Sequence, residues 1–308
     1  MIAIFTIKDD LHALVVQKEI QRRGVTCYII EVDQMWNKNL INIDFFQSSE
    51  FYLSDNKGLT VYIEELHTIW WRRSVRGQLF NSSELEDEYK GFVNNEFEAS
   101  LFGLLHSKFK GKWISHPFST TLASNKIIQT QLALHAGFTL PKTLFSQDGE
   151  KITKFIKTNS FEVIIKPVYG STKTPLYTQK IDKLDLPDCE HFNVCPAIYQ
   201  EFVPGTTHLR INVFGDKIYP FMIHTKDLDW RQDITNPISF VEVDSSLEKE
   251  LKSLLSVMDL QMGIFDFKVN DVDKKLYFFE VNPQGNFLFL EGVTKYPLTE
   301  KFADFIIG

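Results

Sequence analysis

Two carboxylates and an amide near the C-terminus are the side chains whose types and spacing best suit chemistry. Residues 263–286 are typical of a β-hairpin, with apolar-rich runs at 263–270 and 276–282 around a polar turn at 271–275. Because alternate residues of a strand share a face, one face holds Asp266, Glu280 and Asn282. Mg²⁺ accepts such oxygen ligands alongside substrate phosphates. The pattern favours a magnesium platform for nucleotide chemistry, and the alternative is a solvated hairpin face.

The register of this hairpin decides which side chains surround the platform. Pairing Asn270 with Leu276 puts Lys268 opposite Phe278 and Asp266 opposite Glu280. The other face then presents apolar side chains to a core: Phe265, Phe267, Phe279 and Val281.

Basic side chains earlier in the chain suit phosphate binding. Lys126 opens a helix over 126–136, although a lone lysine there also fits a solvated side chain. Lys166 ends the buried strand 161–167, where an unpaired ammonium is costly. Gly170, Ser171 and Thr172 follow in a small-residue loop whose amides and hydroxyls can cover phosphate oxygens, without the spacing of a P-loop.

Two further segments carry polar groups between apolar neighbours. Strand 197–203 contains Gln200 and Glu201. Arg210 lies inside strand 209–214, where it suits phosphate or carboxylate recognition and equally a cross-strand ion pair. Residues 227–231 add Asp229, a weak candidate for a general base, and Arg231.

The strand 68–71 ends in two tryptophans and two arginines. Trp71, Arg72 and Arg73 can form a binding edge for an acidic partner. The alternative is a tryptophan core covered by arginine stems.

The predicted elements indicate an α/β chain of two or three lobes. Strand 1–7, helix 11–23 and strand 25–32 predict a parallel βαβ start, followed by a hairpin over 51–63 and a long helix over 81–108. We expect a domain boundary within 110–118 and an amphipathic helix over 247–260, directly before the C-terminal hairpin.

Composition limits the class of protein. A net charge of −7 disfavours a general nucleic-acid binder. The three cysteines form no metal motif and are most simply reduced thiols. The N-terminus lacks a signal-peptide pattern and no run is long and apolar enough for a bilayer. We therefore expect a cytoplasmic protein with no membrane and no nucleic-acid partner.

The order of these pieces resembles the ATP-grasp carboxylate–amine and carboxylate–hydroxyl ligases from about residue 117 onward. Residues 1–111 resemble the domain that precedes the ATP-grasp fold in the peptide-modifying branch. Within the superfamily the chain is most similar to the microviridin-type (graspetide) ligases. The similarity is carried by the segments TIWWRR, SNKIIQTQLALHAGFTLPKTL, IIKPVYGSTKTPLYTQKI, YQEFVPGTTHLRINVFGDKIYP, LDWR and YFFEVNPQGNFLF.

This resemblance implies an activity and a set of partners. The family uses ATP and Mg²⁺ to join acidic side chains of a ribosomal precursor to Ser, Thr or Lys side chains, as esters or amides. It implies a precursor peptide with a leader and an acidic core, and a homodimer. The implied domains are 1–115 (pre-ATP-grasp), 116–190 (central lobe with the glycine loop) and 191–308 (C-terminal lobe with the metal hairpin).

The resemblance also implies a role for each candidate residue. Lys126 and Lys166 would contact phosphates, and Asp266, Glu280 and Asn282 would hold Mg²⁺. Arg210, then Arg231, would stabilise the transferring phosphoryl group. The glycine loop Gly170, Ser171 and Thr172 would close over the phosphates, and the adenine pocket would be formed by Gln200, Glu201, Phe202 and Val203. Trp71, Arg72, Arg73 and Asp229 would meet the precursor. His208 departs from the pattern, because many relatives have an acidic ribose-binding residue there.

Two other functions share these residues. One is an ATP-grasp ligase that adds amino acids to a protein tail or to a small acid, and the other is an ATP-binding regulatory module without turnover. The edge at Trp70–Arg73, the LDWR segment and the N-terminal domain favour the peptide ligase over the first, and the complete set of phosphoryl-transfer residues favours an enzyme over the second. We expect Glu280→Gln or Arg210→Ala to abolish product and leave the fold intact.

Overall fold

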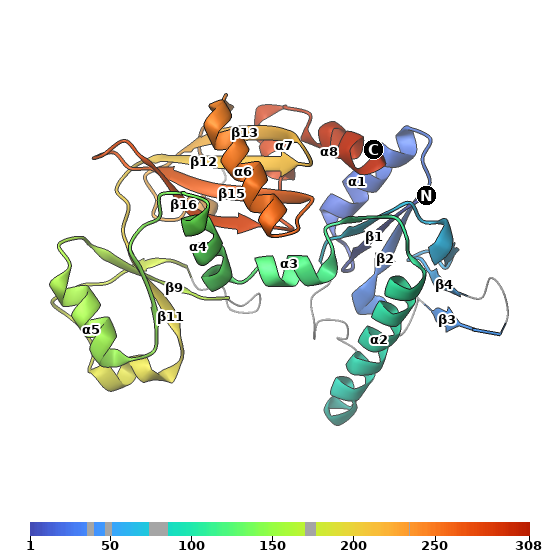
Figure 1. Cartoon of the computed structure of the whole chain (residues 1–308), viewed down its shortest axis with the longest axis horizontal. Coiled ribbons are helices and arrows are strands. Elements are labelled where there is room, and N and C mark those ends of the chain that lie inside the picture. Colours follow the sequence, from blue (N-terminus) through green and yellow to red (C-terminus); the bar gives the residue numbers. More distant parts are fainter. Residues whose placement is uncertain (36–39, 47–50, 74–85, 170–176, 234) are drawn as a thin grey trace.

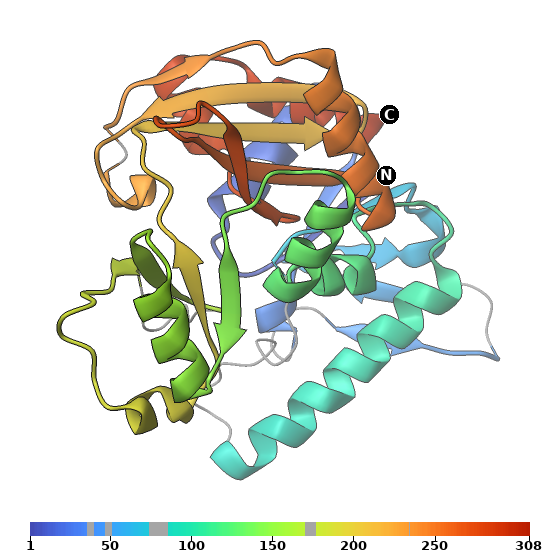
Figure 2. The same ribbon diagram turned by 60° about the vertical axis from the view of Figure 1, so that its left-hand side comes forward.

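The structure, a computed structural model, describes residues 1–35, 40–46, 51–73, 86–169, 177–233 and 235–308. These residues form an N-terminal lobe, a smaller central lobe and a C-terminal lobe built on a large sheet (Figure 1). Both ends of the chain lie near the N-terminal lobe in Figures 1 and 2. The predicted α/β class is confirmed.

The N-terminal lobe is built on a parallel sheet in the order β2-β1-β6-β7. Strand β1 is buried along its whole length, and Asp10 caps helix α1 by accepting from the backbone N–H of His12. This confirms the parallel βαβ start. The elements are β1 (Ile2–Thr6), α1 (Leu11–Arg22), β2 (Cys27–Glu31), β3 (Ile41–Ile43), β4 (Phe51–Ser54), β5 (Thr60–Tyr62), β6 (Thr68–Trp71), α2 (Asp87–Lys108) and β7 (Lys112–Ile114).

The central lobe is a small antiparallel sheet in the order β10-β9-β11-β8, with helix α5 packed against β8. Strand β11 lies beyond the boundary predicted at residue 190, yet it pairs with both β8 and β9. Helices α3 and α4 lead into this lobe, but α4 packs on β16 and α6 of the large sheet. The elements are α3 (Pro117–Ala123), α4 (Lys126–His135), β8 (Thr143–Ser146), α5 (Gly149–Thr158), β9 (Val163–Pro167), β10 (Gln179–Lys180) and β11 (Ala197–Glu201).

The C-terminal lobe is a five-stranded antiparallel sheet in the order β14-β13-β12-β15-β16. Its face toward α6 and α4 is apolar, with Phe265, Phe267 and Phe278 in one core cluster. The elements are β12 (Thr207–Phe214), β13 (Lys217–His224), β14 (Ile238–Phe240), α6 (Ser245–Val257), β15 (Met262–Val269), β16 (Leu276–Asn282), α7 (Leu288–Thr294) and α8 (Leu298–Ile307).

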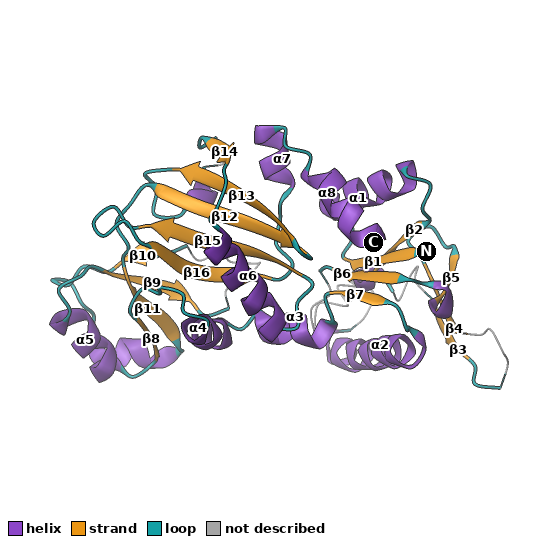
Figure 3. Cartoon of the chain, turned by 45° about the horizontal axis from the view of Figure 1, so that its top comes forward, coloured by secondary structure: helices purple, strands orange, loops and turns teal. Residues whose placement is uncertain are grey.

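One apolar core joins the N-terminal lobe to the C-terminal lobe. Trp70 of β6 and Phe214 of β12 both pack on Phe302 of α8, with ring centroids 4.6 and 4.9 Å apart. Helix α8 also lies beside α1 (Figure 3). The N-terminal lobe is thus packed against the end of the sheet that carries the predicted metal platform.

Candidate functional site

The C-terminal hairpin places Asp266 directly opposite Glu280, as the sequence predicts. The register at the turn end differs from the prediction, because Val269 and not Asn270 lies opposite Leu276. A β-bulge next to Asp266 takes up this difference of one residue. The two deviations cancel at the carboxylate pair.

The bulge changes which aromatic side chains face the core. Phe278 is 1 % exposed and packs beneath the sheet, and Lys268 lies opposite Tyr277 instead of Phe278. Phe279 is half-buried, and its ring centroid lies 5.6 Å from Nζ of Lys166. The prediction that Phe279 faces the core is therefore wrong, because nothing in the residue pattern marks the extra residue of a bulge.

Arg210 forms a cross-strand ion pair with Asp266. Strands β12 and β15 put the two residues opposite each other, and Nη1 of Arg210 lies 2.7 Å from each carboxylate oxygen. The guanidinium lies over the rings of Trp230 and Phe289, at 5.1 and 5.6 Å from their centroids. Its Nε is buried and has no hydrogen-bond partner among the described residues. Within the described structure, Arg210 thus has an unsatisfied buried donor beside the two carboxylates.

Two lysines, from helix α4 and strand β9, surround Glu280 with positive charge. Lys126 Nζ, at the start of α4, lies 3.4 Å from Oε2 of Glu280. Burial alone would raise the pKa of Glu280, but Lys126, Lys166 and Arg231 outweigh it and lower that pKa. Burial and the neighbouring Lys126 lower the pKa of Lys166 to about 8. The predicted phosphate lysines and the predicted carboxylate are therefore brought together.

Asp266, Glu280 and Asn282 suit a hard divalent cation. Burial raises the pKa of Asp266 against the pull of Arg210, and the charge of Glu280 raises it further. Two adjacent carboxylates that oppose each other's ionisation are stabilised by a bound cation. The exposed Asn282 adds an oxygen, which accepts from the backbone N–H of Gln284 at 3.1 Å. No group of three or more His, Cys, Asp or Glu side chains arranged for a metal occurs in the described ranges.

Asp229 and Arg231 pair with each other at the edge of this cluster. Asp229 Oδ1 accepts from Nε of Arg231 at 2.7 Å, and Oδ2 accepts from Nη2 at 2.5 Å. Burial would raise the pKa of Asp229, but the bonds and charge of Arg231 lower it. A carboxylate held in its charged form by a guanidinium is a poor proton acceptor, which weakens Asp229 as a general base.

The predicted adenine pocket lies at the end of β11. Gln200 is buried and donates to Thr143 Oγ1 at 2.8 Å, and Glu201 Oε2 accepts from the backbone N–H of Lys142 at 3.0 Å. Val203 is 2 % exposed. The predicted loop residues Gly170, Ser171 and Thr172 lie outside the described residues.

Two lysines that sequence reasoning missed lie over the ring of Phe202. Nζ of Lys180 and Nζ of Lys268 lie 3.9 and 5.1 Å from its ring centroid. His208 is adjacent to Lys268 across the strand pair, and its Nε2 is buried without a partner among the described residues. Lys268 was within reach of sequence analysis, because it lies two residues from Asp266 on the same strand face.

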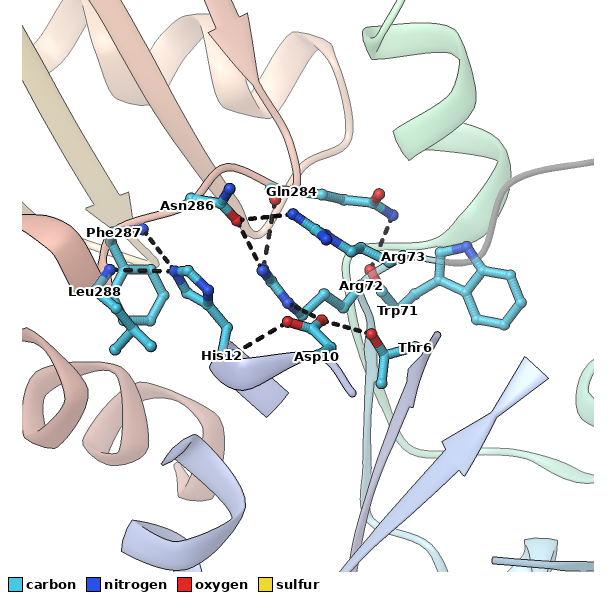
Figure 4. A network of polar contacts seen from close by, with 10 residues as sticks. All are labelled: Thr6, Asp10, His12, Trp71, Arg72, Arg73, Gln284, Asn286, Phe287 and Leu288. Atoms are coloured by element: carbon cyan, nitrogen blue, oxygen red, sulfur yellow. Dashed lines mark hydrogen bonds and ion pairs between the residues drawn. The ribbon is translucent and has the colours of Figure 1, made fainter. Parts of the chain in front are cut away.

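The predicted precursor-binding edge is largely internal. Arg72 is 0 % exposed and its Nε donates to Asp10 Oδ2 at 2.6 Å, so it is not available to a peptide at the surface (Figure 4). This contradicts a direct contact and agrees with the alternative of a tryptophan core covered by arginine. Trp71 is buried but lines an apolar cavity of about 320 Å³ beside Phe102. Arg73 is half-buried, which leaves its predicted contact a proposal.

Asn286 is a second residue that sequence reasoning missed. Its backbone oxygen accepts from Nη2 of Arg210 at 3.1 Å, and its side-chain oxygen accepts from Nη2 of Arg72 at 2.8 Å. The turn-forming segment 282–286 drew attention to this part of the sequence. Its partner Arg72 lies 214 residues earlier, and no local sequence pattern links the two.

No helix in the described part of the chain is long and apolar enough to cross a membrane.

Comparison with known protein families gives a match to the N-terminal part of the chain. Residues 1–120 match the family model of the MvdD pre-ATP grasp domain. No curated protein matches the chain.

Solved structures match over almost the full length. Macrocyclase MdnC from Microcystis aeruginosa MRC, bound with precursor peptide MdnA, has 23% identity and a TM-score of 0.87, covering 99% of each chain. A RiPP-associated ATP-grasp ligase from Chryseobacterium gregarium, in complex with ADP and a leader and core peptide, has 24% identity and a TM-score of 0.87, covering 99% of this chain and 96% of that one. ATP-grasp ligase PsnB, complexed with minimal precursor, Mg and ADP, has 18% identity and a TM-score of 0.78, covering 99% and 97%.

These matches confirm the predicted fold and the resemblance on which it rests. Residues 1–120 are similar to the MvdD pre-ATP grasp domain, and the whole chain shares the fold of the solved ATP-grasp ligases.

Proposed function

We propose that this chain is an ATP- and Mg²⁺-dependent peptide ligase. It would activate Asp or Glu side chains of a ribosomal precursor as acyl phosphates and join them to Ser or Thr as esters or to Lys as amides. The observation that carries the proposal is the buried Arg210, whose Nε lacks a partner among the described residues, beside the carboxylates of Asp266 and Glu280. The fold shared with ligases solved with precursor peptides supports it.

Ester or amide formation from a free carboxylate in water is uphill, so the carboxyl oxygen must first take the γ-phosphoryl group of ATP. This step needs positioning and charge neutralisation more than covalent help. Lys126 and Lys166 would hold the phosphates, since both already face one carboxylate of the site. The acceptor hydroxyl or amine then attacks the acyl carbon, phosphate leaves, and the linked product has lost one water overall.

Asp266, Glu280 and Asn282 are the residues that would hold Mg²⁺. Bound there, the ion supplies neutralisation of the phosphate charge and orients the phosphate oxygens. Arg210 would donate to the transferring phosphoryl group, because its stacking on Trp230 and Phe289 fixes the guanidinium plane. Arg231 is exposed enough to approach the same group from the edge of the site.

The nucleotide base would lie beside Phe202. The ammonium groups of Lys180 and Lys268 lie over the ring of Phe202. The remaining contacts of the proposal are Gln200, Glu201 and the backbone of Val203 for adenine, and Gly170, Ser171 and Thr172 for the phosphates. Trp71, Arg73 and Asp229 are kept as precursor contacts. The family resemblance adds a homodimer to the proposal. The free cysteines support a cytoplasmic location.

A ligase acting on a protein tail or small acid is the rival. It is supported by a match to a RimK domain ATP-grasp protein from Sphaerobacter thermophilus DSM 20745, at 12% identity and a TM-score of 0.60. That TM-score is lower than the 0.87 of the precursor-bound ligases.

The intact mass of the peptide separates these functions. An acidic precursor that contains Thr and Lys and is encoded beside the protein is incubated with enzyme, ATP and Mg²⁺. We expect losses of whole waters that require ATP. An unchanged peptide mass, with ATP hydrolysis stimulated by a free amino acid or small acid, supports the rival. If the peptide mass does not change and no acceptor stimulates ATP hydrolysis, the remaining function is an ATP-binding module.

A further inference from the structure

The loop at residues 284–288, which follows the metal hairpin, is held by the N-terminal lobe. Nη2 of Arg72 donates to Asn286 Oδ1 at 2.8 Å, and Nη1 donates to the backbone oxygen of Gln284 at 3.5 Å. In return, Nε2 of Gln284 donates to the backbone oxygen of Trp71 at 3.1 Å. Figure 4 shows these side chains meeting between the two lobes. The end of β6 therefore fixes one end of the loop.

His12 fixes the other end of the loop. Its Nε2 accepts from the backbone N–H groups of Phe287 and Leu288, both at 3.1 Å. Leu288 is the first residue of α7, so the imidazole occupies the position of a helix cap. Burial and the charge of Arg72 lower the pKa of His12 to about 3, so the ring is neutral and keeps the lone pair that accepts.

Asp10 makes the Arg72 anchor rigid. Its Oδ2 accepts from Nε of Arg72 and from Oγ1 of Thr6, both at 2.6 Å, while Oδ1 caps α1. The side chains of Arg72 and Asp10 are 0% and 2% exposed. A buried carboxylate that accepts several hydrogen bonds holds the guanidinium in one orientation.

The loop in turn contacts Arg210, because the backbone oxygen of Asn286 accepts from its Nη2 at 3.1 Å. We propose that Arg72, His12 and Asn286 are positioning residues through which the N-terminal lobe orients Arg210 toward the transferring phosphoryl group. This inference rests on the proposed function. It gives the N-terminal domain a part in the phosphoryl-transfer step besides any part in binding the peptide.

Attachment of the two lobes does not depend on this network. Arg23, which caps the C-terminus of α1, pairs with Asp304 of α8 and donates to the backbone oxygen of Glu300 at 3.0 Å. Nζ of Lys112 donates to the backbone oxygen of Phe305 at 3.1 Å, and the shared apolar core lies between them. A change at Asn286 can therefore alter the orientation of Arg210 while the lobes stay together.

Asn286→Ala tests the inference, with Arg23→Ala as a matched control that removes another polar contact between the lobes. Crosslinking rates at varied ATP and precursor give kcat and KM, and thermal unfolding reports on the fold. We expect Asn286→Ala to lower kcat by about tenfold to a hundredfold, because a small displacement of a group that acts on the reacting atoms costs that much in rate. KM for ATP, ADP affinity and Tm should change little, and Arg23→Ala should keep the wild-type kcat.

Asn286→Asp is the conservative variant. It keeps an oxygen for Arg72, since the side-chain contacts of Asn286 in the described structure use Oδ1, and it should recover most of the lost kcat. A kcat near wild type in Asn286→Ala, or an equal loss of kcat in Arg23→Ala, overturns the positioning role. A parallel fall of kcat, ADP affinity and Tm without rescue by Asp would show a structural role only. Wild-type protein that never modifies a precursor overturns the proposed function and this inference with it.

Discussion

Replacing Glu280 by glutamine removes one of the two adjacent carboxylates and keeps the size of the side chain. Glu280 lies opposite Asp266 and 3.4 Å from Nζ of Lys126. The Coulomb attraction of such a pair is about 5 kcal/mol at an effective dielectric constant of about 20, before desolvation is subtracted. The two side chains are 27% and 26% exposed, so the net contribution to stability falls to about 1 kcal/mol.

Burial raises the pKa of Asp266 and the charge of Glu280 raises it further, and the same substitution removes this second contribution. The two effects oppose each other, so the free energy of unfolding should change by no more than about 1 kcal/mol and Tm by a few degrees at most, roughly 2–4 °C. Catalysis has no such compensation, because the carboxylate would hold the cation that neutralises the phosphates. Loss of a preorganised electrostatic group of this kind typically costs about a hundredfold to a thousandfold in rate, or about 3–4 kcal/mol.

The assay is the initial rate of water loss from the precursor at saturating ATP and Mg²⁺, beside thermal unfolding of each protein. Glu64→Gln is the matched control, because Glu64 forms a similar pair with Lys108 at 3.2 Å in the N-terminal lobe. We expect wild-type rates for the control and a rate at least about a hundredfold lower for Glu280→Gln. A Glu280→Gln rate within about threefold of wild type, a difference of under about 1 kcal/mol, would refute the assignment of Glu280 to the phosphate site.

Two further substitutions test the buried side chains of Arg210 and His12. Arg210→Ala should abolish activity and also destabilise the fold by about 3–5 kcal/mol, because Asp266 then loses the guanidinium with which it pairs and stays largely buried. This corrects the expectation of an intact fold, and an unchanged midpoint of urea unfolding would contradict it. His12 binds a proton in the unfolded chain at its ordinary pKa of 6.5 but in the folded chain only near 3, so its contribution to stability is present above pH 6.5 and is lost as pH falls. Between about pH 7.5 and 5.5 the wild type should lose about 1.4 kcal/mol more than His12→Gln in urea unfolding, and equal losses would contradict the neutral cap.

The pairing of Asp266 with Glu280 was predictable, because period-two patterning and the turn at 271–275 constrain a hairpin strongly. The bulge was not, since two compensating shifts leave no trace in the polar pattern and become visible only in the burial of Phe278 and Phe279. Lys166 was singled out by its place at the end of a buried strand and Lys126 by the family resemblance, and the positive charges of both act on Glu280.

Arg72 shows the limit of local reasoning. Its place after a buried strand allowed an exposed binding edge or a buried anchor, and its partners Asp10 and Asn286 decide for the anchor. They lie 62 and 214 residues away in sequence, so only the folded chain brings them together. For the same reason Asn286 was invisible as a contact of Arg210.

Transfer of a carboxyl oxygen to phosphate tests the central claim most directly. A precursor whose Asp and Glu carboxylates carry ¹⁸O is incubated with the protein, ATP and Mg²⁺, and the released phosphate is analysed by mass. If the carboxylate is activated as an acyl phosphate, the bridging oxygen leaves with the phosphate, so each link formed should yield one phosphate with one ¹⁸O. Unlabelled phosphate alongside a crosslinked peptide, or labelled AMP in its place, would contradict activation by γ-phosphoryl transfer.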